Sequence, residues 1–400
     1  MWRMSWALRY SLLIFRHMKN LLTISFLVLL AACGGKESES TEPVNILENL
    51  TYSVDTVVVD AGDDFVNVGF GLGAFDLTPD QNQLMFFERD PLKMVRVDLK
   101  QLKVLGKTEF QKEGPNGVGS SVIGFQIGPN SVLAIQSFNS YSKFNMSGEL
   151  IESLKVVPEE IDSELANDYQ KLYNRAVFDS QNNRIYTQPT SEVFKENELF
   201  IIDPLSKKVK SFPIPEMKAV NKFSATYTTK SGESTMYRYF GVSGFMEKEN
   251  GQLLISAAPT SGFYRLDTQT DSLEFIDIQH KTVLNQWSIT VDNTPSDEAT
   301  FMEDRRKVNE QLNFMAIRWD ESREMYLRLG KKTYLGENPG DPSSYEFYLF
   351  AYDKDFNVLG ETKLGELEPE PRSYFWKDGK LWSYVNVEDE LGFAVFTFDF

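Results

Sequence analysis

Three arginines of this chain stand where we expect the innermost strands of a repeated β-structure to begin. They are Arg175, Arg238 and Arg372. A guanidinium group donates parallel hydrogen bonds that match the two oxygens of a carboxylate. Because such strands begin around one opening, we predict that these side chains, with Asn313, bind an acidic sugar or a peptide carboxylate. The alternative is that each arginine pairs with an acidic residue of its own sheet.

Aromatic side chains lie near the same expected strand starts. An aromatic ring combines apolar area with a polar tip, which suits sugar rings and peptide segments. Packing between neighbouring sheets is the alternative role for each of them. The aromatic residues assigned to the predicted site are Tyr239, Trp287 and Tyr374, with Tyr173, Tyr237 and Tyr334 nearby.

Metal and cofactor chemistry has little support in the composition. The chain holds two histidines and one cysteine, so disulfides, thiolate zinc sites and His-rich metal sites are excluded. Outside the N-terminal segment the remaining histidine is His280, and a lone general base needs a positioned partner that the sequence does not identify. We therefore predict no metal and no cofactor, and we assign no catalytic residue.

The cysteine, Cys33, stands at the end of an export signal. An apolar run from Leu21 to Leu30 follows the basic residue Lys19 and is shorter than the roughly 20 residues of a membrane span. The segment Leu30-Ala31-Ala32-Cys33 resembles the bacterial lipobox, in which the thiol is acylated and the cysteine becomes the first residue after cleavage. We predict a lipoprotein in which Cys33 anchors the chain to a membrane.

The predicted parts of the chain are a signal peptide over 1–32, the lipidated cysteine with a flexible tether over 33–50, and a folded body over 51–400. Both Met1 and Met18 are candidate start residues. The segment Lys36-Glu37-Ser38-Glu39 resembles the acidic tags that send some lipoproteins to the outer face of the outer membrane, and an ordinary solvated tether is the alternative. We therefore expect a cell-envelope protein anchored in the outer membrane.

The charge balance limits the partners. The chain has 41 Lys and Arg against 58 Asp and Glu, which gives a formal net charge of −17. Phosphate binding relies on clustered basic residues, so nucleic acid is excluded as the main partner. The partners that remain are the membrane, through the lipid on Cys33, and an envelope protein or an acidic oligosaccharide or peptide.

Short alternating apolar segments, separated by Gly, Pro, Asn and Asp turns, continue almost to the C-terminus and predict an all-β fold. Hairpins of this kind recur six times, and five of them are followed by a second hairpin, so each unit is a four-stranded meander. This pattern predicts a six-bladed β-propeller. The six first hairpins are Phe75 to Phe87, Phe125 to Ile135, Val177 to Tyr186, Phe245 to Ile255, Ile317 to Leu327 and Phe375 to Tyr384.

The two ends of the repeat are complementary. The sixth unit stops after its third strand, Phe393 to Phe398, while Tyr52 to Val59 is a strand without a unit. We predict that this N-terminal strand completes the last blade. Such closure leaves only short, protected sheet edges.

One stretch of the first unit carries a family resemblance. The residues Asp76-Leu77-Thr78-Pro79-Asp80, followed by Gln83-Leu84-Met85-Phe86, resemble the propeller repeat of TolB-like proteins. The whole chain is similar to the uncharacterised six-bladed propeller lipoproteins of Gram-negative bacteria, which carry a domain of unknown function. The resemblance implies the fold and brings no catalytic motif.

The long connecting segments are expected at one end of the blades, and long loops commonly carry function. We predict a non-catalytic protein that binds a ligand or partner through this surface. One alternative is an envelope polysaccharide lyase or hydrolase acting at the channel mouth, and another is a structural subunit of an envelope complex, since propellers host all three. The long segments are Val157 to Leu172, Ile214 to Tyr237, Ile278 to Gln311 and Leu329 to Ser344.

Overall fold

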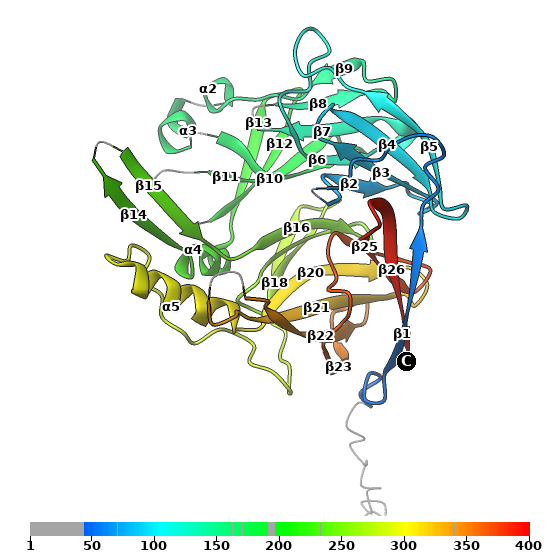
Figure 1. Cartoon of the computed structure of the whole chain (residues 1–400). Helices are drawn as coiled ribbons and strands as arrows, with labels where there is room; N and C mark the ends of the chain where they lie inside the picture. Colours follow the sequence, from blue (N-terminus) through cyan, green and yellow to red (C-terminus); the bar gives the residue numbers. More distant parts are fainter. Residues whose placement is uncertain are drawn as a thin grey trace, which may run out of the picture. The chain divides into compact units, whose positions relative to one another are not determined.

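Six antiparallel sheets of four strands each are arranged as blades around a common centre in the computed structural model (Figure 1). The structure describes residues 44–400 apart from 70, 139, 162, 170, 191–196, 233, 339 and 340. The predicted signal peptide and Cys33 lie outside the described residues. Residues 45–400 form one compact unit. The predicted all-β, six-bladed propeller is confirmed.

The first three blades follow one another along the chain, each with its strands in sequence order. The first blade consists of β2 (Phe75–Leu77), β3 (Gln83–Glu88), β4 (Lys93–Asp98) and β5 (Lys103–Glu109). The second consists of β6 (Val122–Ile127), β7 (Leu133–Ser137), β8 (Tyr141–Phe144) and β9 (Leu150–Ser153). The third consists of β10 (Lys171–Asp179), β11 (Arg184–Thr190), β12 (Glu198–Asp203) and β13 (Lys208–Pro213).

The fourth and fifth blades repeat this order, and the sixth takes its last strand from the N-terminus. The fourth blade consists of β16 (Gly244–Glu249), β17 (Gln252–Ala257), β18 (Phe263–Asp267) and β19 (Ser272–Ile276). The fifth consists of β20 (Asn313–Asp320), β21 (Met325–Tyr334), β22 (Ser344–Tyr352) and β23 (Val358–Gly365). The sixth consists of β24 (Tyr374–Lys377), β25 (Lys380–Val387), β26 (Glu390–Asp399) and β1 (Thr51–Val58).

Ring closure takes place where the two ends of the described chain meet. Strand β1 pairs antiparallel with β26, from Thr51 opposite Asp399 to Val58 opposite Gly392. Figure 1 shows the blue N-terminal strand beside the red C-terminal strand. The predicted closure of the last blade by the N-terminal strand is confirmed.

Local turn chemistry explains why the innermost hairpins form. In the fourth blade Asn250 and Gly251 both have positive φ angles, 46° and 75°, and Asp378 and Gly379 repeat this in the sixth, at 52° and 70°. Two consecutive residues with positive φ match the right-handed twist of the strands that they connect. In these two blades the turn leads directly from the innermost strand to the second strand.

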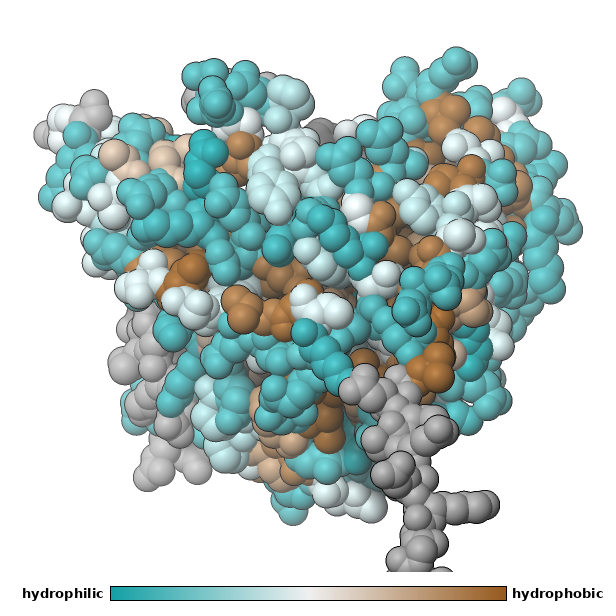
Figure 2. Space-filling view, turned by 90° about the horizontal axis from the view of Figure 1, so that it is seen from below, coloured by the Kyte–Doolittle hydropathy of each residue, from teal (hydrophilic) through white to brown (hydrophobic). Residues whose placement is uncertain are grey.

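The apolar core lies between neighbouring blades. One buried cluster joins Phe86 and Val95 of the first blade to Phe393 and Val395 of the sixth. The surface seen in Figure 2 is mostly hydrophilic, and its hydrophobic residues lie in separate patches. The protein is therefore held together by contacts between blades.

Because adjacent strands run in opposite directions, connections between blades lie at the same end of the sheets as the loops between second and third strands. We call this end the long-loop face. It carries the short helices η2 (Pro215–Lys218) and α4 (Ala219–Lys222), whereas η1 (Pro129–Ser131) belongs to a first hairpin turn at the opposite end. No helix among the described residues is long and apolar enough to cross a membrane.

Three of the long segments contain helices or strands. The segment before the fifth blade contains α5 (Glu298–Asn309), whose N-cap Asp297 accepts a hydrogen bond from the Thr300 N–H. The segment before the third blade contains two short helices, α2 (Pro158–Ile161) and α3 (Ser163–Asp168). An additional hairpin, β14 (Ala225–Ser231) and β15 (Ser234–Phe240), precedes the fourth blade and was not predicted.

Candidate functional site

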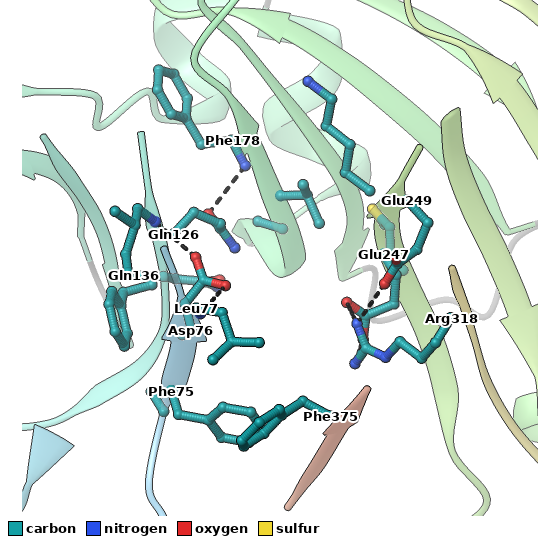
Figure 3. A pocket seen from close by; sticks show the side chains of 18 of the residues that line it. Phe75, Asp76, Leu77, Gln126, Gln136, Phe178, Glu247, Glu249, Arg318 and Phe375 are labelled. Atoms are coloured by element: carbon teal, nitrogen blue, oxygen red, sulfur yellow. Dashed lines mark hydrogen bonds and ion pairs between the residues drawn. The ribbon is translucent and has the colours of Figure 1, made fainter. Parts of the chain in front are cut away.

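The innermost strands of all six blades line one cavity of about 790 Å³. A cavity of this size is typical of small-molecule sites, which usually measure about 300–1,000 Å³. The close-up in Figure 3 shows Asp76 on one wall and Arg318 with Glu247 and Glu249 on the facing wall. The central channel of the propeller is therefore the candidate site.

An arginine between two glutamates forms one wall. Arg318 Nη1 lies 2.9 Å from Glu247 Oε2 and 2.9 Å from Glu249 Oε1, while Nη2 lies 2.9 Å from Glu247 Oε1. Burial raises the pKa of Glu249, and the two carboxylates raise the pKa of Arg318 against the effect of its own burial. Two carboxyl groups thus share one guanidinium, and the formal charges of the three side chains sum to −1.

Asp76 in β2 supplies the carboxyl group on the other wall. Its Oδ2 accepts a hydrogen bond from the Ile127 N–H at 2.8 Å, and its Oδ1 accepts one from the Leu77 N–H at 2.9 Å. Burial raises the pKa of Asp76 to about 7, although both backbone hydrogen bonds act to lower it. Asp76 therefore exchanges its proton near neutral pH.

Polar side chains of the channel wall also accept hydrogen bonds from backbone N–H groups of the neighbouring blade. An innermost strand has no further strand on its channel side, so some of its N–H groups lack a sheet partner. Gln126 Oε1 accepts from the Phe178 N–H at 3.3 Å, and Glu249 Oε2 accepts from the Trp319 N–H at 3.2 Å. With Asp76 and Ile127, three blade-to-blade contacts are made in this way. The polar channel wall thus has a structural role that operates without any ligand.

Arg175 in β10 lines the channel as predicted from the sequence. Its Nη1 lies 3.4 Å from Gln188 Oε1, which is a long hydrogen bond. Burial lowers the pKa of Arg175, and nearby Tyr239 acts in the opposite direction. Among the described residues no carboxylate lies within ion-pairing distance of this guanidinium. Arg175 is therefore a cation available to a ligand.

Tyr374, at the start of β24, also lines the channel, and burial raises its pKa to about 12. The phenol stays protonated at neutral pH and can donate a hydrogen bond. Asn313, at the start of β20, is not among the lining residues, and its Nδ2 donates to the Gln311 carbonyl at 3.0 Å. The structure thus brings Tyr374, but not Asn313, to the same cavity as Arg175.

Two of the three predicted arginines are engaged elsewhere. Arg238 lies on β15, where it contacts the Glu298 carboxylate and its guanidinium stands 5.2 Å from the ring centre of Phe301 on α5. Arg372 lies before β24 and pairs with Glu370, its Nε being 3.0 Å from Oε2. Neither lines the channel. Both arginines thus pair with nearby acidic residues, as in the alternative given for them.

The remaining predicted aromatic residues differ in exposure. Trp287 is 5% exposed, packs in the core beside Phe223 and donates from Nε1 to the Leu312 carbonyl at 2.7 Å. Tyr239 is 66% exposed on the extra hairpin, outside the cavity lining. Packing is thus the observed role of Trp287, whereas Tyr239 is open to solvent.

His280 has partners that the sequence did not reveal. Its Nδ1 lies 3.0 Å from Glu361 Oε2, and Nε2 lies 3.2 Å from the Tyr352 hydroxyl. Burial lowers the pKa of His280 to about 4, which Glu361 opposes. The histidine is buried among the aromatic rings of Phe314 and Phe350 and does not line the channel. This network is accordingly assigned to packing between the fourth and fifth blades.

Sequence reasoning missed the four charged residues that dominate the channel wall. Their common signal was a charged side chain within the innermost strand of a predicted hairpin, close to its turn. No group of three or more His, Cys, Asp or Glu side chains in the described part of the chain is placed to hold a metal ion. The four residues are Asp76, Glu247, Glu249 and Arg318.

Comparison with known proteins places the chain in a family. A family model described as a domain of unknown function, DUF4221, matches residues 43–363. The chain belongs to the DUF4221 family. A crystal structure of a DUF4221 member from Bacteroides vulgatus is similar, with a TM-score of 0.61 and 16% sequence identity over 88% of this chain and 98% of that one. This likeness supports the fold of the DUF4221 propeller.

More distant propellers resemble the chain weakly. Hydrazine synthase of Kuenenia stuttgartiensis matches with a TM-score of 0.37 and 10% identity, over 82% of this chain and 78% of that one. The Swd1 β-propeller domain of Myceliophteria thermophila matches with a TM-score of 0.40 and 12% identity, over 81% and 82%. No curated protein sequence matches the chain significantly. These likenesses carry no argument about function.

Proposed function

We propose that this propeller is a lipid-anchored envelope protein that binds a carboxylate-bearing oligosaccharide or peptide at the long-loop end of its channel. In this proposal Arg175 receives the ligand carboxylate, and Tyr374 donates a hydrogen bond from the wall. In this proposal the anchor is the group of acyl chains attached to Cys33, which keeps the propeller in the cell envelope, at the outer membrane.

The observation that carries the proposal is the uncompensated charge of Arg175. The neighbouring lysine of the channel wall, Lys248, is neutralised by Asp179 at 2.6 Å, and Arg318 is held by two glutamates. An arginine beside a cavity of about 790 Å³, without a carboxylate partner among the described residues, favours an anionic ligand.

Exposed apolar side chains at the long-loop face support contact with something larger than an ion. Phe138 follows β7, Tyr237 and Tyr239 lie on the hairpin that precedes the fourth blade, and Leu284 lies in the segment before α5. All four are more than half exposed. These side chains are available to contact a ligand or partner at this face.

Calorimetric titration of the purified chain tests the proposal. The ligands are oligomers of a uronic acid, the matched neutral oligomers and short peptides. We expect binding of at least one acidic class, and a loss of about tenfold or more in affinity in Arg175→Gln. Arg372→Gln is the matched control, because Arg372 is exposed and lies outside the channel. Unchanged binding in Arg175→Gln would contradict the proposal.

A second candidate function is hydrolysis or elimination on an envelope polysaccharide at the same channel. The observation that favours it is the carboxyl group of Asp76, whose pKa of about 7 suits proton transfer at neutral pH. Release of new reducing ends from a bound polyuronide, lost in Asp76→Asn, would support it. Binding without any turnover would exclude it for the sugars tested.

A further inference from the structure

The channel separates its charges along the direction of the innermost strands. Gly244 is the first residue of β16, and a Cβ built on it would lie 3.1 Å from Arg175 Cζ. The Arg175 guanidinium therefore lies beside the first residue of this strand. Glu247 and Glu249 lie further along the same strand, towards the hairpin turn at the opposite end. The channel therefore has a positive end at Arg175 and an acidic end at Glu247 and Glu249.

The separation of the two ends follows from strand geometry. A strand rises about 3.3 Å per residue, so Glu247 stands roughly 10 Å beyond Gly244 and Glu249 roughly 17 Å beyond it. Side chains shorten or lengthen these distances by a few ångströms. The nearer carboxylate is thus separated from the guanidinium by about the length of a short extended ligand.

The acidic end keeps a negative charge after its internal ion pairs are counted. Glu247 and Glu249 share the single cation Arg318, at 2.9 Å each. Asp76 faces this group across the channel (Figure 3), and the charge of Glu247 contributes to the raised pKa of Asp76. A cationic or hydrogen-bond-donating group of a ligand would therefore be favoured at this end.

We propose that the ligand of the channel is a zwitterion, an extended peptide of about three residues whose terminal carboxylate binds Arg175 and whose ammonium group lies between Glu247 and Asp76. This inference rests on the proposed function and narrows its ligand class to peptides. Three residues in extended conformation span roughly 10 Å, which matches the separation of the two ends.

The size and walls of the cavity agree with such a ligand. The cavity volume of about 790 Å³ exceeds what a single amino acid needs. Phe75 and Phe375 lie against each other with ring centres 6.3 Å apart, between the two charged walls in Figure 3. Their rings give an apolar surface for small peptide side chains.

Three tripeptides test the inference by calorimetric titration of the purified chain. They are trialanine with both ends free, N-acetyl-trialanine and trialanine amide. We expect trialanine to bind, and each capped peptide to bind about tenfold or more weakly, because each lacks one of the two charges. Equal affinity for trialanine and N-acetyl-trialanine overturns the zwitterion inference.

Substitutions assign each end of the peptide. We expect Glu247→Gln to weaken trialanine binding about tenfold while leaving N-acetyl-trialanine unchanged, and Arg175→Gln to weaken trialanine binding while leaving the amide unchanged. Asp76→Asn, which keeps the shape of the side chain, is the second variant should Glu247→Gln fail to fold. Glu274→Gln is the matched control, since Glu274 pairs with Arg265 on the outer strands of the fourth blade.

The outcomes separate this inference from the proposed function. Binding of uronic-acid oligomers through Arg175 without binding of trialanine supports the proposed function and overturns the zwitterion inference. Absence of binding by every acidic ligand overturns both. Loss of trialanine binding in the control Glu274→Gln to the same extent as in Glu247→Gln also overturns the inference, because the effect would then not be specific to the channel.

Discussion

The carboxylate of Asp76 accepts a hydrogen bond from the backbone N–H of Ile127 at 2.8 Å, and so joins the innermost strand of the first blade to that of the second. The same carboxyl group faces the cavity and has a pKa of about 7. One side chain thus closes the channel wall and changes its charge near neutral pH. The stability of the ring and the charge of the channel are therefore linked.

This linkage predicts a pH-dependent stability difference between the wild type and Asp76→Asn. The native state keeps the Asp76 proton up to about pH 7, whereas the unfolded chain releases it near the ordinary value of 3.8. Because the native state binds more protons between these values, the contribution of Asp76 to stability falls as the pH rises through this window. Asparagine does not titrate. The free energy of unfolding of Asp76→Asn, relative to that of the wild type, should therefore rise by about 1–2 kcal/mol from about pH 5 to about pH 8, after allowance for water in the channel.

Urea unfolding of both proteins at the two pH values gives this difference. His280 adds a slope of opposite sign, because its native pKa is about 4 and the unfolded imidazole takes up a proton near 6.5. That slope is common to both proteins and cancels in the comparison. A stability difference that stays constant with pH would show that Asp76 does not change its protonation on unfolding.

Arg328 gives a prediction about the buried polar contacts between blades. It is 1% exposed, and it donates to the Ser261 carbonyl at 2.6 Å and to the Met315 carbonyl at 2.7 Å. Arg328→Met leaves these carbonyl groups without a donor, so we expect a loss of about 2–4 kcal/mol in the free energy of unfolding. Urea unfolding measures it, with Arg372→Met as the exposed control, for which about 0.5 kcal/mol or less is expected. Similar losses in the two variants would contradict this account.

The fold could be predicted from the sequence because its signals are local. Turn pairs such as Asn250-Gly251 separate short alternating strands, and these signals recur in every blade. The extra hairpin was missed because β14 and β15 lie inside a long connection, where an alternating stretch of Thr and Tyr was interpreted as loop. For this reason Arg238 was expected near the start of the innermost strand of the fourth blade, whereas it lies in β15, before that strand begins at Gly244.

The candidate site could be predicted only in part, because its contacts are made between blades. Arg175 and Tyr374 were found from their positions near strand starts. The pairing of Arg318 with Glu247, 71 residues apart, depends on how the fourth and fifth blades turn towards one another. A sequence read one strand at a time contains no measure of this angle, so the acidic wall of the channel was not foreseen.

Packing of the sixth blade against the fifth leads to a prediction about Phe396 in β26. This side chain is fully buried in a cluster that includes Leu327 and Leu349 of the fifth blade. Phe396→Ala leaves a cavity there, so we expect a loss of about 3–5 kcal/mol in the free energy of unfolding, measured with urea. Phe65→Ala is the control, because Phe65 is exposed. A loss below about 1 kcal/mol in Phe396→Ala would mean that the blade interface relaxes to fill the space.

The proposed lipidation of Cys33 yields a prediction that is independent of the channel. Two or three acyl chains hold a protein firmly on a membrane, whereas a single chain gives only marginal binding. In this proposal the Cys33 thiol carries the lipid, so we expect Cys33→Ala to abolish metabolic labelling with an alkynyl fatty acid and to leave residues 1–32 attached. Gel fluorescence measures the labelling, and mass spectrometry shows whether residues 1–32 are still attached. Ser38→Ala is the control, because it alters the segment after the cysteine and leaves the thiol in place. Labelling that persists in Cys33→Ala would place the acyl group on another residue, and the anchor would then not depend on the lipobox.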